Sequence, residues 1–332
     1  MLIVRAIREH DLPALLALTQ LVGLGMTTLK ADPATLSQRI EIACASFAGT
    51  LRREQCDYLF VMEDTERGRL AGVCAIKAAV GLDEPFYNYR IGTLVHSSAA
   101  LNVFARMETL YLSNDLTGCS ELCSLFLHPD YRSGSNGRLL SKSRFLFIAQ
   151  FPHLFDKRLI AELRGFLQPD GRSPFWDSLG RHFFKMEFDR ADDLTGLGKK
   201  SFIAELMPRH PLYVAHLSEA AQAVIGKTHV DTAPARRLLE QEGMHFDSYV
   251  DIFDAGPVLQ AWVSALRATR ESTLDAAPEA DDPLLVSNTV MHDFRVIIAP
   301  APLAKAALTA LACQPGDPVR SMSLNPPKVT NA

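Results

Sequence analysis

The chain has no stretch that predicts a membrane-spanning helix. No window reaches the roughly 18–20 uncharged apolar residues that such a helix needs. The N-terminal apolar stretch from Leu12 to Val22 is short and lacks the small-residue cleavage pattern of a secretion signal. We therefore expect a cytoplasmic protein.

Cysteine is sparse, and charges of one sign are not clustered. Six cysteines stand at positions 44, 56, 74, 119, 123 and 313, without a Cys-x-x-Cys pair or a His-x-x-x-His partner. This spacing argues against a zinc site and a disulfide framework, and predicts reduced, mostly buried thiols. The 34 basic and 38 acidic residues form no long block of one sign. Neither nucleic acid nor an anionic membrane is therefore favoured as a partner.

The chain does have enough apolar sequence for a large core. It is 48% hydrophobic over 332 residues, which is more than the ~100–200 residues of an ordinary domain. The segment "ESTLDAAPEADDP" at 271–283 is acidic and contains proline, as is typical of a linker. We therefore expect one large region at 1–270, this linker, and a small β-rich unit at 284–332.

Hydrophobic periodicity predicts strands and helices in alternating order. Asp11-Leu12-Pro13 opens the first helix, since Asp caps free N–H groups and Pro is tolerated in the first turn. The stretch 83–114 fits neither pattern clearly. The order predicts an α+β fold with a mixed α/β sheet flanked by helices. The expected strands are 2–7, 58–64, 70–80, 121–128, 158–166, 201–206 and 249–254, and the expected helices include 33–48, 138–151, 173–188, 218–226 and 232–243.

A glycine-bearing loop, "HPDYRSGSNG", lies between a buried strand and a helical run. Such a loop can turn several backbone N–H groups to one point, where the helix N-terminus adds partial positive charge. Arg132 and Arg138 supply full charges. The alternative is a tight hairpin turn at Asn136-Gly137, but the helical run that follows favours an anion site. The loop lacks both Gly-x-x-x-x-Gly-Lys-Ser/Thr and Gly-x-Gly-x-x-Gly.

This arrangement resembles the acyl-CoA N-acyltransferase (GNAT-like) fold, whose pyrophosphate loop reads Pro-x-x-Arg-x-x-Gly-x-Gly/Ala. Pro129 and Arg132 match, but the glycines stand at 134 and 137 rather than 135 and 137. A wider resemblance is carried by several blocks, among them "DLTGCSELCSLFLHPDYRSGSNGRLLSKSRFLFIAQF", "GRSPFWDSLGRHFFKMEF", "FIAELMPRHPLYV", "IGKTHVDTAPA" and "VDIFDAGP". Over roughly residues 1–270 the chain resembles the arginine N-succinyltransferase family, especially its β-type subunit.

The resemblance implies an enzyme that moves succinyl from succinyl-CoA to the α-amine of L-arginine, the first step of an ammonia-yielding route of arginine breakdown. Succinyl-CoA is then a co-substrate, and no cofactor is tightly bound. The expected assembly is a homo-oligomer or a heteromer with a related subunit. Two alternatives stay open, namely a related amine such as ornithine as acceptor, or a non-catalytic partner role.

The resemblance also assigns site residues. His229 is implied as the proton donor, and Leu125, on the strand before the loop, as a succinyl-CoA contact through its backbone. A histidine with a pKa near neutrality can protonate a departing thiolate. The alternative for His229 is an ordinary structural role, as a polar residue near the start of a helix. The loop residues expected to hold the coenzyme are Arg132, Ser133, Gly134, Ser135, Asn136, Gly137 and Arg138.

The substrates impose further requirements. A guanidinium calls for a carboxylate, and each substrate carboxylate calls for a cation or amides. A second histidine, His182, is expected to satisfy a buried hydrogen bond among aromatic residues. The candidate acids are Asp115, Glu121, Glu162, Glu205, Asp251 and Asp254, each of which could equally be a cap or salt-bridge partner, and the candidate cations are Arg90, Arg164 and Arg181.

Overall fold

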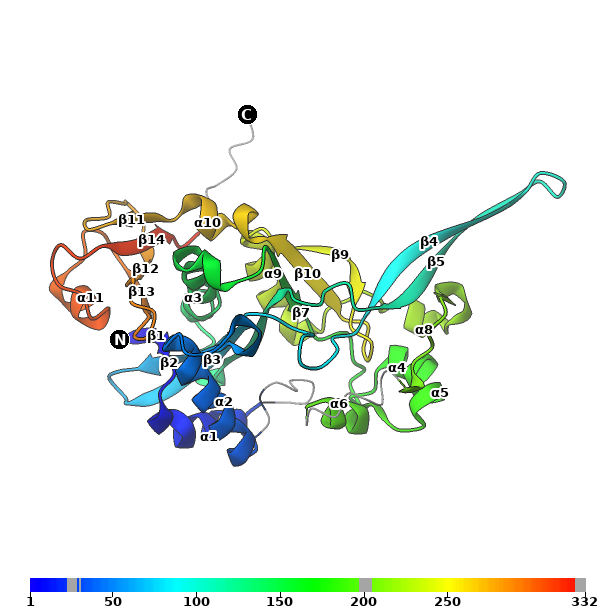
Figure 1. The fold of residues 1–332 in the computed structure, drawn as a ribbon, viewed down its shortest axis with the longest axis horizontal. Coiled ribbons are helices and arrows are strands. Elements are labelled where there is room, and N and C mark those ends of the chain that lie inside the picture. The colour runs from blue at the N-terminus through cyan, green and yellow to red at the C-terminus, as the bar shows by residue number, and fades with distance from the viewer. Residues whose placement is uncertain (23–28, 30, 197–204, 326–332) are drawn as a thin grey trace.

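The computed structural model describes residues 1–22, 29, 31–196 and 205–325 of the chain (Figure 1). Their strands form one mixed sheet in the order β11-β14-β12-β13-β1-β2-β3-β6-β7-β10-β9-β4-β5-β8. The strands are β1 Leu2–Ala6, β2 Asp57–Asp64, β3 Arg69–Lys77, β4 Asn88–Ser98, β5 Val103–Ser113, β6 Ser120–Leu127, β7 Arg158–Glu162, β8 Leu212–Tyr213, β9 His245–Val250, β10 Pro257–Trp262, β11 Thr273–Asp275, β12 Leu284–Ser287, β13 Arg295–Ala299 and β14 Val319–Ser323. The predicted mixed fold class is confirmed.

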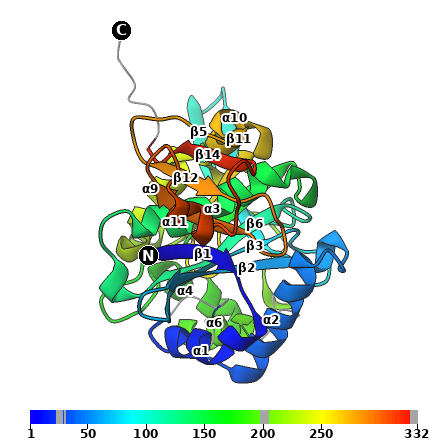
Figure 2. The ribbon, with the colours of Figure 1, turned by 90° about the vertical axis from the view of Figure 1, so that its left-hand side faces the viewer.

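The helices cover both faces of this sheet (Figure 2). Within the described ranges, no helix has both the length and the apolar character needed to cross a membrane. The helices are α1 Leu12–Thr19, α2 Pro33–Phe47, α3 Asn136–Gln150, α4 Pro174–Ser178, α5 Gly180–Phe184, α6 Phe188–Gly196, α8 Glu219–Gln222, α9 Ala233–Gln241, α10 Arg267–Glu271 and α11 Lys305–Ala310.

Helix α3 is the central element of the molecule. Residues 139–149 are all buried, because α3 packs on β3 and β6 and against α9 and α10. Phe147 lies edge-on to Phe60 and Phe294, with ring centroids 5.1 and 4.9 Å apart. Helices α1 and α2 pack with buried residues of β2 and β3 in a separate cluster. The start of α3 is thereby fixed where β6 ends.

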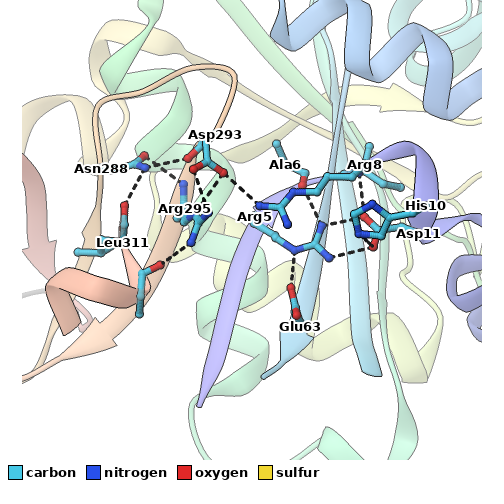
Figure 3. A network of polar contacts seen from close by, with 12 residues as sticks. Arg5, Ala6, Arg8, His10, Asp11, Glu63, Asn288, Asp293, Arg295 and Leu311 are labelled. Atoms are coloured by element: carbon cyan, nitrogen blue, oxygen red, sulfur yellow. Dashed lines mark hydrogen bonds and ion pairs between the residues drawn. The ribbon is translucent and has the colours of Figure 1, made fainter. Parts of the chain in front are cut away.

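The C-terminal strands continue the N-terminal sheet, since β13 pairs antiparallel with β1. Figure 3 shows the polar network at this junction. Arg5 donates to both carboxylate oxygens of Asp11, at 2.7 and 2.8 Å, and Arg8 pairs with Asp293 at 3.3 Å. Strand β11 lies within the predicted linker. The division into a large region, a linker and a unit at 284–332 stays a prediction.

The stretch 83–114, which the sequence left ambiguous, contains a long hairpin arm. Strands β4 and β5 pair along their whole length and project away from the rest of the molecule (Figure 1). Large apolar side chains are exposed on its outer half, namely Val95, Leu101, Val103 and Phe104. The arm therefore presents an uncovered apolar surface.

Three predicted elements differ in the structure. The helix predicted at 173–188 is divided between α4, α5 and the start of α6, and a Cβ at Gly180 would collide with the Trp176 ring. The strand predicted at 249–254 ends at the second residue of that range, and a tight turn follows. The strand predicted at 201–206 lies mostly outside the described residues.

Candidate active site

The candidate site lies where two neighbouring strands separate. Strands β6 and β7 are parallel, and their register pairs Ser120 with Leu159 and Glu121 with Ile160 only. Beyond these pairs the strands separate, and a cavity of about 1400 Å³ opens. It is lined by residues 122–127 of β6, the following loop, α3, the end of β7 and the turn after β9. One edge of β6 thus faces a cavity instead of a neighbouring strand.

A bulge interrupts β6 within this cavity. The register pairs Val73 with Phe126 and Ala75 with Cys123, so Ser124 and Leu125 together face a single residue of β3. Ser124 has a positive φ of 55°. The side chain of Leu125 packs on the main core, while its backbone has no partner in the register of either neighbouring strand in the described chain. The backbone of Leu125 is therefore placed to face a ligand.

The loop after β6 leads directly into α3. Gly134 has a positive φ of 57°, a conformation that favours glycine. Two hydrogen bonds hold the loop: Asn136 Nδ2 donates to the Tyr131 carbonyl and Arg132 Nε to the Leu127 carbonyl, both at 3.0 Å. Since α3 starts at Asn136, the Asn136-Gly137 pair is the first turn of a helix and not a hairpin turn. Among the described residues, no acceptor is found for the backbone N–H groups of Gly134, Ser135, Gly137 and Arg138.

Most of the predicted coenzyme contacts line the cavity. Ser135 and Asn136 do not, because Ser135 is the N-cap of α3 and the side chain of Asn136 is turned back to the loop. The predicted residues that do line it are Leu125, Arg132, Ser133, Gly134, Gly137 and Arg138.

His229 is anchored to the end of β7 on the far side of the cavity. Its backbone N–H donates to the Arg164 carbonyl at 2.9 Å, and a β-bridge joins Gly165 to Thr228. Residues 230–232 line the cavity, although His229 itself is not a lining residue. Its side chain keeps 16% of its surface exposed.

The hydrogen bonds of His229 define its tautomer. Nδ1 accepts from the Asp231 backbone N–H at 3.2 Å, so the neutral ring carries its proton on Nε2. Burial and the nearby Arg164 charge lower the pKa of His229 below 6.5, against the opposing effect of the Asp231 carboxylate. The lowered pKa favours the neutral ring, whose Nε2–H is available as a donor to a ligand.

Two carboxylates line the cavity in the turn after β9, the buried Asp254 and the partly buried Asp251. Asp254 accepts from the Gly165 N–H at 2.7 Å and from the Gly256 N–H at 2.8 Å. Asp251 accepts from the N–H groups of Phe253 and Asp254 at 2.7 and 2.9 Å. Burial raises the pKa of both, and the charge of Asp251 raises that of Asp254 further. A cation bound beside this pair would be stabilised.

Three other sequence candidates also line the cavity. Glu121 and Glu162 are lining residues, and Glu162 accepts from Asn88 Nδ2 at 2.6 Å. Arg164 lines the cavity too, and its buried Nε has no hydrogen-bond partner in the described part of the chain. These residues place both acids and a cation around the same space.

The remaining candidates lie elsewhere. Asp115 pairs with Arg90 at 3.5 Å on the surface, Arg181 forms a surface ion pair, and Glu205 is exposed. His182 is exposed as well, so the expectation that it satisfies a buried hydrogen bond is wrong. The reason is that the predicted helix is broken, and this part of α5 faces outward.

The sequence analysis missed three cations that line the cavity, Lys77 on β3, Arg144 on α3 and Arg237 on α9. Arg144 stands in an apolar helical run, four residues after Leu140 on the same helical face. A lone charge on the core face of a buried helix is the signal that could have singled it out. No cluster of His, Cys, Asp and Glu suited to a metal ion occurs in the described ranges.

Comparison with known proteins agrees with this geometry. The family model described as "Arginine N-succinyltransferase beta subunit" matches residues 2–268. Proteins named arginine N-succinyltransferase from Citrobacter koseri, Escherichia coli and Shigella flexneri are each 50% identical over 98% of both chains. A solved structure, that of arginine/ornithine succinyltransferase subunit AI from Pseudomonas aeruginosa, matches with a TM-score of 0.90 and 33% identity over 98% of this chain and 99% of that one. The chain therefore belongs to the arginine N-succinyltransferase family.

Proposed function

We propose that this protein transfers the succinyl group of succinyl-CoA to the α-amine of L-arginine and releases coenzyme A. The observation that carries the proposal is the continuity of the cavity wall. The open edge of β6 leads without interruption into a loop with unbonded N–H groups at the start of a 15-residue helix. Family membership supplies the chemistry that this wall serves.

The loop and the strand would hold different parts of the coenzyme. Four N–H groups without an acceptor in the described chain, those of Gly134, Ser135, Gly137 and Arg138, suit a pyrophosphate together with the helix N-terminus. The side chains of Arg132 and Arg138 add positive charge. The backbone of Leu125 at the bulge suits the amide groups of the pantetheine arm, or the thioester carbonyl. Succinyl-CoA acts as a co-substrate that binds and leaves as coenzyme A.

The reaction needs two proton movements, and we propose His229, which lies beside the cavity-lining residues 230–232, as the group that serves them. The amine nitrogen attacks the thioester carbon, the C–N bond forms, the C–S bond breaks, and the amine loses a proton while the thiolate gains one. In the neutral ring Nε2–H can give its proton to the thiolate, while Nδ1, released from the Asp231 N–H, takes up the proton that the amine loses, each transfer passing through water, so the ring is neutral before and after. The lowered pKa of His229 favours the neutral form that starts this sequence.

The acids of the cavity suit a cationic acceptor. Asp251 and Asp254 are neighbouring carboxylates whose pKa values are raised by burial, and Glu121 and Glu162 line the same space. A guanidinium or ammonium side chain bound there would relieve their mutual repulsion. Arginine and ornithine both meet this requirement, so an experiment must show which of the two is the preferred acceptor.

The test is the release of free thiol when the purified protein is mixed with succinyl-CoA and an amine. We expect release with L-arginine, with a product whose mass is that of succinylarginine. Nα-acetylarginine is the matched control, since its guanidinium is intact and its α-amine is blocked, and it should give no release. A higher kcat/KM with ornithine would reassign the acceptor. Absence of release with every amine would contradict the proposal.

We also propose that the protein works as an oligomer of identical chains that meet through the β4–β5 arm. The matching family and the solved relative from Pseudomonas aeruginosa are both described as subunits. The arm stands clear of the body and exposes four large apolar side chains, among them Leu101 and Phe104 at 75% and 74%. Light scattering should give a multiple of the 36.6 kDa chain, and Phe104→Asp should lower it. A monomer mass for the unchanged chain would contradict this assembly and favour a heteromer with a related subunit.

A further inference from the structure

Arg144 is a buried cation on the wall of the cavity. Arg144 is only 2% exposed, yet it lines the cavity. Gly137, Leu140 and Arg144 follow one another on one face of α3 and all line the cavity. Arg144 comes seven positions after Gly137, so it lies about 10 Å along the helix axis from Gly137.

The hydrogen bonds of Arg144 go to neutral acceptors. Nε donates to the Ser141 carbonyl at 3.2 Å, Nη2 donates to Ser141 Oγ at 3.2 Å, and Nη1 donates to the Cys123 carbonyl at 3.4 Å. These bonds use three of the five N–H donors of a guanidinium. Over residues 1–22, 29, 31–196 and 205–325, no carboxylate forms an ion pair with Arg144.

The same helix shows how a buried cation is otherwise accommodated. Lys142 is fully buried, and its Nζ lies 3.0 Å from a carboxylate oxygen of Glu242 and 3.0 Å from the Leu324 carbonyl. Lys142 is therefore neutralised within the protein. Arg144, two residues later, has no such partner among the described residues, so its charge is left for something that enters the cavity.

A buried charge without a counter-ion is costly. An arginine cannot relieve that cost by losing its proton, because its guanidinium stays charged in proteins. A carboxylate that enters the cavity can accept the two remaining N–H groups and neutralise the charge at once.

We propose that Arg144 binds the terminal carboxylate of the succinyl group and selects this acyl chain over uncharged ones. This inference rests on the proposed transfer from succinyl-CoA. Arg144 contacts the carbonyl of Cys123, next to the bulge at Ser124 and Leu125. The proposed function assigns the thioester carbonyl or the pantetheine amides to this bulge. Two methylene groups separate the thioester carbonyl of succinyl-CoA from its terminal carboxylate. The two ends of the succinyl group are therefore close enough to contact neighbouring residues of β6.

The test compares succinyl-CoA with butyryl-CoA, in which a methyl group replaces the carboxylate. We expect the unchanged protein to prefer succinyl-CoA in kcat/KM. Arg144→Met should lower kcat/KM for succinyl-CoA roughly 10- to 100-fold, because a charged hydrogen-bond partner is removed. The variant should use butyryl-CoA as well as the unchanged protein does, or better. Its dissociation constant for free coenzyme A, measured by calorimetry, should stay within about two-fold.

Two control variants separate this role from others. Arg138→Met should weaken the binding of free coenzyme A, butyryl-CoA and succinyl-CoA alike, because Arg138 is proposed to contact the coenzyme A part that all three share. Lys142→Met removes a paired buried cation from the same helix, so it should lower stability without changing the acyl preference. Arg144→Lys, which keeps the charge, should restore part of the preference for succinyl-CoA.

The outcomes distinguish the two proposals. If the Arg144→Met variant still prefers succinyl-CoA to butyryl-CoA, the assignment of Arg144 is overturned while the proposed transferase function stands. A loss of free coenzyme A binding equal to the loss of succinyl-CoA binding overturns it too. Absence of transfer from any acyl-CoA by the unchanged protein overturns the proposed function, and this assignment with it.

Discussion

Replacing His229 with asparagine tests the proton-transfer step while keeping the local fold. The His229 ring caps η7 (Val230–Thr232) through Nδ1, which accepts from the Asp231 N–H at 3.2 Å. The Oδ1 of asparagine occupies nearly the position of Nδ1 and can accept the same hydrogen bond. It cannot titrate near neutral pH, so His229→Asn removes the proton exchange and leaves the cap.

The expected loss follows from the role. General acid–base catalysis contributes about 10²- to 10⁴-fold, so kcat should fall by that factor, or about 3–5 kcal/mol in activation free energy. The KM values should change little, because the cavity-lining residues proposed to bind the two substrates are unchanged. Burial and the Arg164 charge lower the pKa of His229. Activity should therefore be present at neutral pH and be lost as the pH falls through a value below 6.5, where the imidazolium forms.

The assay is free-thiol release over a pH range of about 5–8, with kcat and KM separated. His128 provides a matched control, because its Nδ1 also accepts from a backbone N–H two residues ahead, that of Asp130, at 3.2 Å. His128→Asn should keep both the rate and the acid limb. The reasoning is refuted if His229→Asn stays within about ten-fold of the unchanged enzyme and retains the same limb.

Two further predictions concern the framework of the site. Glu242 is fully buried between Lys142 and Arg267, at 3.0 and 2.9 Å. Glu242→Gln leaves the buried Lys142 without a carboxylate partner and Arg267 with Glu271 alone, so it should lower the free energy of unfolding by about 3–5 kcal/mol in urea titrations. A loss below about 1 kcal/mol would show that the pair is not desolvated. A Cβ at Gly165 would lie 2.5 Å from the Asp254 carbonyl and 2.6 Å from its Oδ1. Gly165→Ala should therefore cost roughly 1–3 kcal/mol of stability and slow the reaction, and an unchanged melting temperature and rate would contradict this.

Local sequence patterns predicted much of the scaffold. The apolar run 121–128, the glycine loop and the helical run after it predicted the strand, loop and helix that form the cavity wall. The signals were local, since strand periodicity, a glycine at a positive φ and a helix start all act over a few residues. The resemblance supplied the roles of His229 and Leu125, which their own side-chain types could not.

Local patterns failed where packing at a distance decides the outcome. The β4–β5 arm was missed because a strand exposed on both faces does not show a strong apolar alternation. The turn at 251–254 was read as a strand because it contains Ile252 and Phe253, residue types that are enriched in strands. Its conformation depends on hydrogen bonds to Gly165, far away in the sequence.

The sequence by itself determined the mixed fold class, the position of the loop and the family. The tertiary structure decided which charges belong to the site. It placed Asp115, Arg90 and Arg181 on the surface and brought Arg164, Asp251 and Asp254 to the cavity. It also separated Lys142, which has a buried carboxylate partner, from Arg144, which has none among the described residues. The physical reason is that a charge takes its role from the partners and the dielectric around it, and the fold brings those partners from distant parts of the chain.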